Sequence, residues 1–155
     1  NECDPVCRHL TGHPGAYFEH RCIHGAQLPY HLALPPTAFR AMRLHASQLC
    51  ASLQGTGLVP LAQTPHMAFL QGQEAPYTAY YQERAGMTLV DGHSPACFRA
   101  LAKRFSVHTY RRTPAFHIVV QPEGEHMWRI LDGVHRSALM VHGNSSAAIP
   151  VWCMP

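Results

Sequence analysis

The chain has 155 residues, enough for one domain that buries its own hydrophobic core. Its composition is 46% hydrophobic and only 14% charged, which excludes extensive disorder. The formal net charge of +3 is not gathered into a run of Lys and Arg, and no apolar run of transmembrane length occurs. We therefore expect neither nucleic acid nor a membrane as a partner, and a small anionic ligand suits this charge better.

The N-terminal stretch 1–36 is rich in His, Cys, Pro and Gly and shows no sustained hydrophobic period, so we expect an irregular arm with one short strand at most. Zinc binds thiolate and imidazole groups, but the spacing here fits no standard finger and contains no C-x-x-C pair. Histidine also serves for solubility in an arm with few charges, so zinc is the weaker alternative. The ligands that it would use are Cys3, Cys7, His9, His13, His20, Cys22 and His24.

The six cysteines are spread over the chain, at positions 3, 7, 22, 50, 97 and 153. Their even number permits a disulfide framework, but a chain with this much core does not need one. No signal-peptide pattern is present. We therefore expect mostly reduced thiols and a cytoplasmic location.

A helix and a strand are predicted after the arm. Thr37 resembles an N-cap, and an apolar stripe over 38–53 indicates a helix that Gly55 stops. The stretch 64–70 predicts an apolar strand opened by a polar cluster. Within it, His66 is more typical of a satisfied, partly buried histidine than of a ligand.

Two further helices are predicted over 76–84 and 96–105. Ser94 as N-cap and Pro95 in the first turn mark the start of the second of them. In the first, helical spacing favours core packing over stacking on a base or sugar for Tyr77, Tyr80 and Tyr81. The only basic cluster in the sequence consists of Lys103, Arg104, Arg111 and Arg112. It could favour an acidic substrate, but two short pairs of this kind more commonly form a solvent-exposed face.

The C-terminal third has the clearest pattern, with the order strand, strand, helix, strand. Two β-branched or aromatic runs flank a Pro-Glu-Gly-Glu turn and predict a hairpin. A helix that ends at Gly143 and a last strand follow. The predicted elements are strands over 116–120, 127–131 and 148–152 and a helix over 134–142.

The pentapeptide Asp132-Gly133-Val134-His135-Arg136 lies at the predicted junction of strand and helix. Glycine permits a tight turn in which backbone N–H groups approach a ligand, and the positive end of the helix dipole points to the same place. His135 and Arg136 add side-chain donors, and the planar guanidinium suits phosphate oxygens. These contributions predict an anion site. From the motif alone, the solvated first turn of a helix is an equal alternative, because Asp-Gly is a common turn dipeptide.

The run 116–152 resembles the ParB/sulfiredoxin-like superfamily in its order of elements and in this turn. The matching stretches are His117-Ile118-Val119-Val120, Trp128 to Leu139, Gly143 and Ile149-Pro150-Val151, and the helix that begins at Ser94-Pro95 looks like the helix before the family's Pro-led strand. The resemblance covers roughly residues 88–153. It implies an α+β fold with a small mixed sheet and packed helices. In one domain, 88–155 would be the nucleotide-binding core and 1–87 an N-terminal extension with loops and two helices.

In that superfamily the turn binds nucleotide phosphates, and its members include a chromosome-partitioning CTPase, the ATP-dependent repair enzyme sulfiredoxin and free-serine kinases. The resemblance implies that ATP or a related nucleotide binds here together with magnesium. Asp132 would hold magnesium through water or fix the turn. The residues that would bind the nucleotide are Gly133, Val134, His135, Arg136 and Ser137, with the hydroxyl of Ser137 both capping the helix and reaching a phosphate oxygen.

Two departures from the family narrow the expected activity. Val134 stands where sulfiredoxin has its reactive cysteine, so repair of sulfinic acids is not expected. The DNA-binding relatives carry a helix-turn-helix domain after this core, whereas the sequence stops at Pro155, so chromosome partitioning is not expected. The resemblance then implies a kinase acting on a small hydroxyl-bearing molecule. A non-catalytic nucleotide-sensing or protein-interaction module and a DNA-binding or nuclease domain are the alternatives.

A kinase also needs a group that orients the acceptor hydroxyl or accepts its proton. Asp132, His135 and Asp91 are the candidates for catalysis, and Glu74 and Glu83 are the other carboxylates near the core in the sequence. Asp91 stands just before a predicted helix N-terminus, where a plain capped turn is the more common arrangement.

Overall fold

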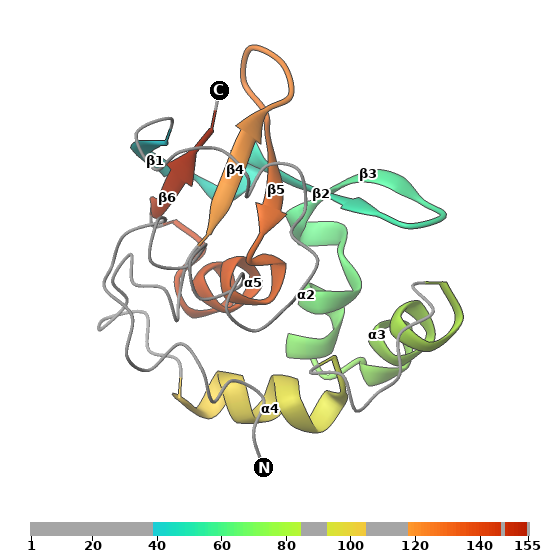
Figure 1. Ribbon diagram of the computed structural model, residues 1–155. Coiled ribbons are helices and arrows are strands. Elements are labelled where there is room, and N and C mark those ends of the chain that lie inside the picture. The colour runs from blue at the N-terminus through green and yellow to red at the C-terminus, as the bar shows by residue number, and fades with distance from the viewer. Residues whose placement is uncertain (1–38, 85–92, 105–117, 147, 155) are drawn as a thin grey trace, which may run out of the picture.

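The described strands form a six-stranded mixed sheet, and the helices lie below it in the view of Figure 1. The computed structural model describes residues 39–84, 93–104, 118–146 and 148–154, and this part of the chain has the α+β class that the sequence predicted. The strands lie in the order β1-β6-β4-β5-β2-β3. Their bounds are Arg40–Leu44 for β1, Leu49–Leu53 for β2, Gly57–Pro60 for β3, Val119–Pro122 for β4, Trp128–Asp132 for β5 and Ile149–Cys153 for β6.

The sheet joins strands from both halves of the chain. The hairpin β4–β5 is antiparallel, as predicted, and lies between β6 and β2, each of which is parallel to its neighbour in the hairpin. The edge strands β1 and β3 pair antiparallel with β6 and β2. In the parallel pair, Leu49 lies opposite Trp128 and Ala51 opposite Ile130. The carboxyl ends of β2 and β5 therefore meet at one edge of the sheet.

The prediction of a helix over 38–53 is wrong. This stretch forms β1, a 3-10 turn at Ala46–Gln48 (η4) and β2. Its apolar residues recur at helical spacing, but β2 is a central strand whose side chains are nearly all buried, and its pairing with β3 and β5 overrides that local pattern.

The strand predicted over 64–70 is also wrong, because this stretch forms helix α2, Pro65–Leu70. Thr64 is its N-cap, and the hydroxyl oxygen accepts a hydrogen bond from the backbone N–H of Met67 at 3.3 Å. Pro65 occupies the first helical position. These are the signals that Ser94 and Pro95 give for the later helix.

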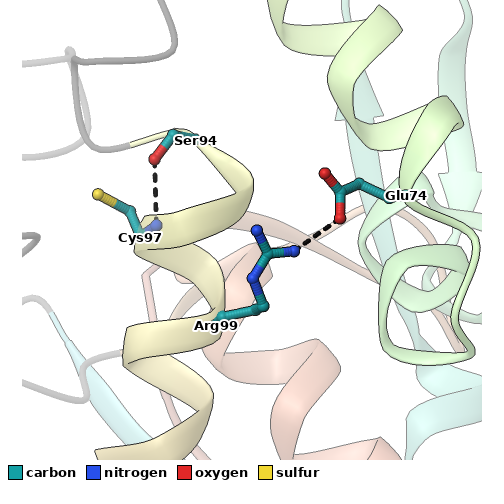
Figure 2. A network of polar contacts seen from close by, with 4 residues as sticks. All are labelled: Glu74, Ser94, Cys97 and Arg99. Carbon is teal, nitrogen blue, oxygen red and sulfur yellow. Dashed lines mark hydrogen bonds and ion pairs between the residues drawn. The ribbon is translucent and has the colours of Figure 1, made fainter.

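The other predicted helices are confirmed, with small changes at their ends. Helix α3, Glu74–Ala79, continues as the π-helical turn η6, Tyr80–Arg84. Helix α4, Pro95–Arg104, begins with the cap that the sequence indicated, since the Cys97 N–H donates to Ser94 Oγ at 3.0 Å (Figure 2). Helix α5 runs Val134–Gly143. The strand expected over 116–120 begins only at Val119 within the described residues.

Helix α5 lies between the sheet and α4, with α2 beside it (Figure 1). Its Ala138, Met140 and Val141 belong to the core cluster of the sheet, with Ile118, Val120 and Ile130 among others. Leu139 packs instead in a second cluster with the buried rings of Tyr77, Tyr81 and Phe98. The prediction that the tyrosines pack in the core is confirmed for Tyr77 and Tyr81, which are 0% and 6% exposed.

The cysteines of the described part differ in their state. Cys50 and Cys153 are buried free thiols, and burial raises the pKa of each. Cys97 forms a disulfide bond. Cys97 is thus an exception to the expectation of mostly reduced thiols. The cysteines and histidines of the proposed zinc alternative lie outside the described residues. None of the described helices is long and apolar enough to cross a membrane.

Candidate anion-binding site

Gly133 makes the turn from β5 into α5 in a conformation that favours glycine. Its φ is +99°, in the left-handed region, where a side chain would be strained. Its carbonyl oxygen accepts two hydrogen bonds at 2.8 Å, one from the Ser137 N–H and one from the Ser137 hydroxyl. Because Ser137 is completely buried and its hydroxyl donates to this carbonyl, its role is to close the turn.

The same turn presents the N-terminus of α5 without a side-chain cap. Gly133 is the N-cap residue and brings no side-chain oxygen for the N–H groups of the first helical turn. The helix has ten residues, so its N-terminus carries a partial positive charge. It lies at the edge where the carboxyl ends of β2 and β5 meet, a common position for ligands in sheets with parallel strands. This geometry suits an anion.

Asp132 and Arg136 form an ion pair on this turn. An Arg136 guanidinium nitrogen lies 3.3 Å from Asp132 Oδ1, and the two side chains are 15% and 25% exposed, in the order Arg136, Asp132. The second carboxylate oxygen, Asp132 Oδ2, is buried and has no hydrogen-bond partner among the described residues. A buried carboxylate oxygen in that state fits a magnesium ion or a water molecule. The Asp132 carboxylate thus holds Arg136 beside the helix N-terminus through one oxygen, and its other oxygen has no partner among the described residues.

His135 points away from this pair and into the cluster of aromatic rings. Its Nε2 lies 2.7 Å from the hydroxyl of Tyr77, and the ring packs edge-on against His66 and Phe98 with centroids at 4.5 and 4.8 Å. Burial holds the pKa of His135 well below its ordinary value, and the charges of His66, His93 and Arg136 lower it further. His135 is therefore neutral at neutral pH, so it does not add a positive charge for a phosphate.

The ring of His135 is held by its hydrogen bond with Tyr77. Burial raises the pKa of Tyr77, so this hydroxyl keeps its proton. When the hydroxyl donates to Nε2, the imidazole proton lies on Nδ1. The hydrogen bond with Tyr77 therefore fixes the orientation of the His135 ring.

His66 is a second histidine in the same cluster and is more fully buried than the partly buried histidine that the sequence predicted. It is 1% exposed, its Nε2 lies 2.7 Å from the Tyr81 hydroxyl, and Nδ1 has no partner among the described residues. Burial and the nearby His93 lower the pKa of His66 to about 3. His93 stacks on Tyr81 with centroids 4.7 Å apart. Despite these three histidines, no group of His, Cys, Asp or Glu in the described residues is arranged to hold a metal ion.

The other predicted site residues are dispersed. Glu74 is half exposed and pairs with Arg99 of α4 at 2.6 Å (Figure 2). Glu83 is exposed on η6 and lines a pocket between α2, α3 and the β2–β3 hairpin. Asp91 lies outside the described residues, as do Arg111 and Arg112 of the basic cluster. Val134 packs against the hydrophobic cluster of β2 and β3.

No family model, curated protein or solved structure matches this chain. The resemblance to the ParB/sulfiredoxin-like superfamily therefore rests on the turn and on the order of elements around it.

Proposed function

We propose that this chain is a ParB/sulfiredoxin-like protein that binds the phosphates of ATP or a related nucleotide at the turn 132–136. The proposed reaction transfers a phosphoryl group to a small hydroxyl-bearing molecule. One observation carries the proposal: Gly133, at φ +99°, opens an α5 N-terminus without a side-chain cap at the carboxyl edge of β2 and β5.

Different groups of the turn would bind the phosphates and the magnesium ion. The backbone N–H groups of the first turn of α5 would contact phosphate oxygens, and Arg136 would add a planar, charged donor. Asp132 would hold magnesium through Oδ2, and the ion would neutralise charge on the phosphates. The ion pair with Asp132 orients Arg136 before any ligand arrives.

His135 serves this site as a positioning residue. Its side chain enters the aromatic cluster, where the ring is fixed by Tyr77 and by the surrounding aromatic side chains. Phosphoryl transfer depends chiefly on positioning and on charge neutralisation, so a rigid support behind the first turn of α5 favours it.

A nucleotide-sensing module is the second candidate, and one observation favours it. Asp132 is paired with Arg136 and His135 with Tyr77, so neither is placed as a free base. In such a module the nucleotide would bind at the same turn without transfer.

Incubation with magnesium ATP and a panel of small alcohols separates the kinase from the sensor, with ADP release as the readout. Release that depends on the alcohol supports the kinase. Binding of the nucleotide without release of ADP supports the sensor.

Use of a nucleotide fits a cytoplasmic location, as do the free thiols of Cys50 and Cys153. The disulfide bond at Cys97 favours an oxidising compartment, because such bonds are rare in the cytoplasm. Titration of accessible thiols in protein purified from cells with blocked thiol exchange tests this point: a thiol at Cys97 supports the cytoplasm.

Thermal unfolding tests the binding step. ATP, ADP, CTP and GTP are each added with magnesium to the wild type, to Arg136→Ala and to Arg99→Ala, an arginine on α4 that serves as the matched control. At least one nucleotide should raise the Tm of the wild type and of the control through mass action, and Arg136→Ala should lose the shift. The proposal fails if no nucleotide raises the wild-type Tm, or if the Arg136 variant responds like the control.

A further inference from the structure

A pocket of about 430 Å³ lies between α2, α3 and the β2–β3 hairpin and takes no part in the proposed phosphate binding. Its size falls within the range of small-molecule sites. Three separate segments form its walls: the β2–β3 hairpin, helix α2 with the residues before it, and α3 with η6. The residues that matter for its chemistry are Leu53, Val59, Gln63, Ala68, Tyr80 and Glu83.

The walls of the pocket are held together by specific contacts. The hydroxyl of Tyr80, on η6, accepts a hydrogen bond from the backbone N–H of Gln54 at 3.3 Å and so joins the hairpin to the helices. Thr64 fixes the start of α2 by donating to the carbonyl of Leu61 at 2.8 Å. The π-helical turn that carries Tyr80 and Glu83 is a rare conformation that recurs at functional sites. The pocket is therefore formed before a ligand arrives.

One hydrophobic cluster links the pocket to the turn that carries the proposed phosphate site. Val134, the first residue of α5, packs against the cluster of Ala51, Leu53 and Val59, and Leu53 and Val59 line the pocket. Leu53 also ends β2, whose carboxyl end lies beside that of β5. The cluster against which Val134 packs thus supplies two residues of the pocket lining.

The charge of the lining limits what can bind. Most of the lining is apolar, and Glu83 is the only lining residue with a charged side chain among those described. Gln63 and Thr56 add neutral polar groups. A carboxylate or phosphate in the pocket would meet a like charge from Glu83, whereas an amine would meet an opposite one. An apolar arm would cover the rest of the wall.

We propose that this pocket binds the acceptor of the phosphoryl transfer, and that the acceptor is an amine-bearing alcohol with an apolar arm. This inference rests on the proposed function. In the transfer, the acceptor oxygen forms a bond to the terminal phosphorus of ATP, the bond from that phosphorus to its bridging oxygen breaks, ADP leaves with the electron pair, and the hydroxyl proton is released to water. Glu83 holds the amine, so it is a specificity residue.

Two probes of matched shape test the charge preference. Phenylalaninol carries a ring, a hydroxyl and an amine, and 3-phenyllactate carries the same ring and hydroxyl with a carboxylate. Calorimetry with the full chain should show phenylalaninol binding at least about tenfold more tightly than phenyllactate. Equal binding, or no binding of phenylalaninol at about 10 mM, overturns the inference.

Two variants place the probe in the pocket. Glu83→Gln should weaken phenylalaninol binding about tenfold, whereas Glu125→Gln, at an exposed glutamate of the β4–β5 turn, should not change it. Ala79→Phe fills the pocket and should abolish binding, and Ala100→Phe on α4 is its control for added bulk. Unchanged binding in both pocket variants overturns the inference. If Ala79→Phe unfolds the chain, Glu83→Gln decides alone.

The nucleotide-dependent Tm shift separates this inference from the proposed function. Both pocket variants should keep the shift, because neither changes the turn. If nucleotide still raises the Tm of the wild type but phenylalaninol does not bind, only the acceptor pocket is disproved. If no nucleotide raises the Tm of the wild type, the proposed function is disproved, and the acceptor role of the pocket with it.

Discussion

The first turn of helix α5 has two sides that differ in their chemistry. On one side, Asp132 and Arg136 form a partly exposed ion pair beside an uncapped helix N-terminus. On the other side, His135 and Ser137 are turned inward, toward an aromatic cluster and toward the carbonyl of Gly133. The six residues 132–137 thus supply both a binding surface and the support that holds it. Changes on the first side should alter ligand binding, and changes on the second should alter stability.

Acidification should produce the largest effect, and it acts on the buried side. Burial and His93 lower the pKa of His66 to about 3, below the ordinary 6.5 of an unfolded histidine. The folded state therefore favours the neutral form of His66. The stability that this preference contributes is fully present above pH 6.5 and is lost as the pH falls from 6.5 toward 3. His66 alone should cost about 2–3 kcal/mol of unfolding free energy between about pH 7.5 and pH 4.5, measured by urea unfolding.

Carboxylates also titrate on acidification, so a variant without the imidazole is the control. His66→Gln lacks the ionisable ring and retains an amide that can meet the Tyr81 hydroxyl. Its loss of stability between the two pH values should be smaller than that of the wild type by the amount assigned to His66. An identical pH dependence in variant and wild type contradicts the assignment.

Tyr77→Phe should have the next largest effect and should separate support from binding. It leaves His135 Nε2 buried without its partner at 2.7 Å, which should cost about 1–3 kcal/mol of stability. Because the ion pair of Asp132 and Arg136 is untouched, the Kd for magnesium ATP in calorimetry should change by no more than about threefold at a temperature where the variant is folded. A large loss of affinity at unchanged stability would assign Tyr77 to the binding side instead.

Gly133→Ala should affect both sides of the turn. At φ +99° a Cβ adds strain of about 1–2 kcal/mol, and any shift that relieves it moves the N–H groups of α5. We expect a lower Tm together with loss of the nucleotide-dependent Tm shift. Gly124→Ala, in the β4–β5 turn where nothing lies within 4 Å of an added Cβ, is the matched control. A Gly133 variant that binds nucleotide as the wild type does would show that the turn geometry is not needed.

Glu74→Gln should have the smallest effect. Glu74 and Arg99 pair at 2.6 Å, but both side chains are at least half exposed (Figure 2). An exposed pair of this kind contributes about 0.2–1 kcal/mol, and salt weakens it. Urea unfolding should therefore show a small loss that disappears at high salt, with no change in nucleotide binding. A loss above about 2 kcal/mol would mean that α3 and α4 depend on this contact for their packing.

The elements that the sequence predicted correctly carry local signals. Ser94 and Pro95 specify the start of α4, and Gly133 specifies the break between β5 and α5. The strands β1 and β2 were mistaken for a helix because their identity depends on distant partners. Leu49 pairs with Trp128, far along the chain, and no local spacing encodes that contact.

The candidate site divides in the same way. The left-handed glycine and the helix N-terminus follow from a short motif, so the position of the turn could be predicted. The direction of His135 could not, because it depends on Tyr77 and Phe98, which come from two other helices. The pocket beside Tyr80 has walls from three segments and no motif of its own. Only the packed structure brings these residues together.

Amide chemical shifts of the first turn of α5 test the central claim most directly. Magnesium ATP is titrated into ¹⁵N-labelled protein, and the backbone N–H signals are followed. The account predicts the largest shift changes at residues 134–136, with small changes at Gly143 at the far end of the helix. Shift changes that spare the first turn of α5, or no changes at millimolar nucleotide, would contradict it.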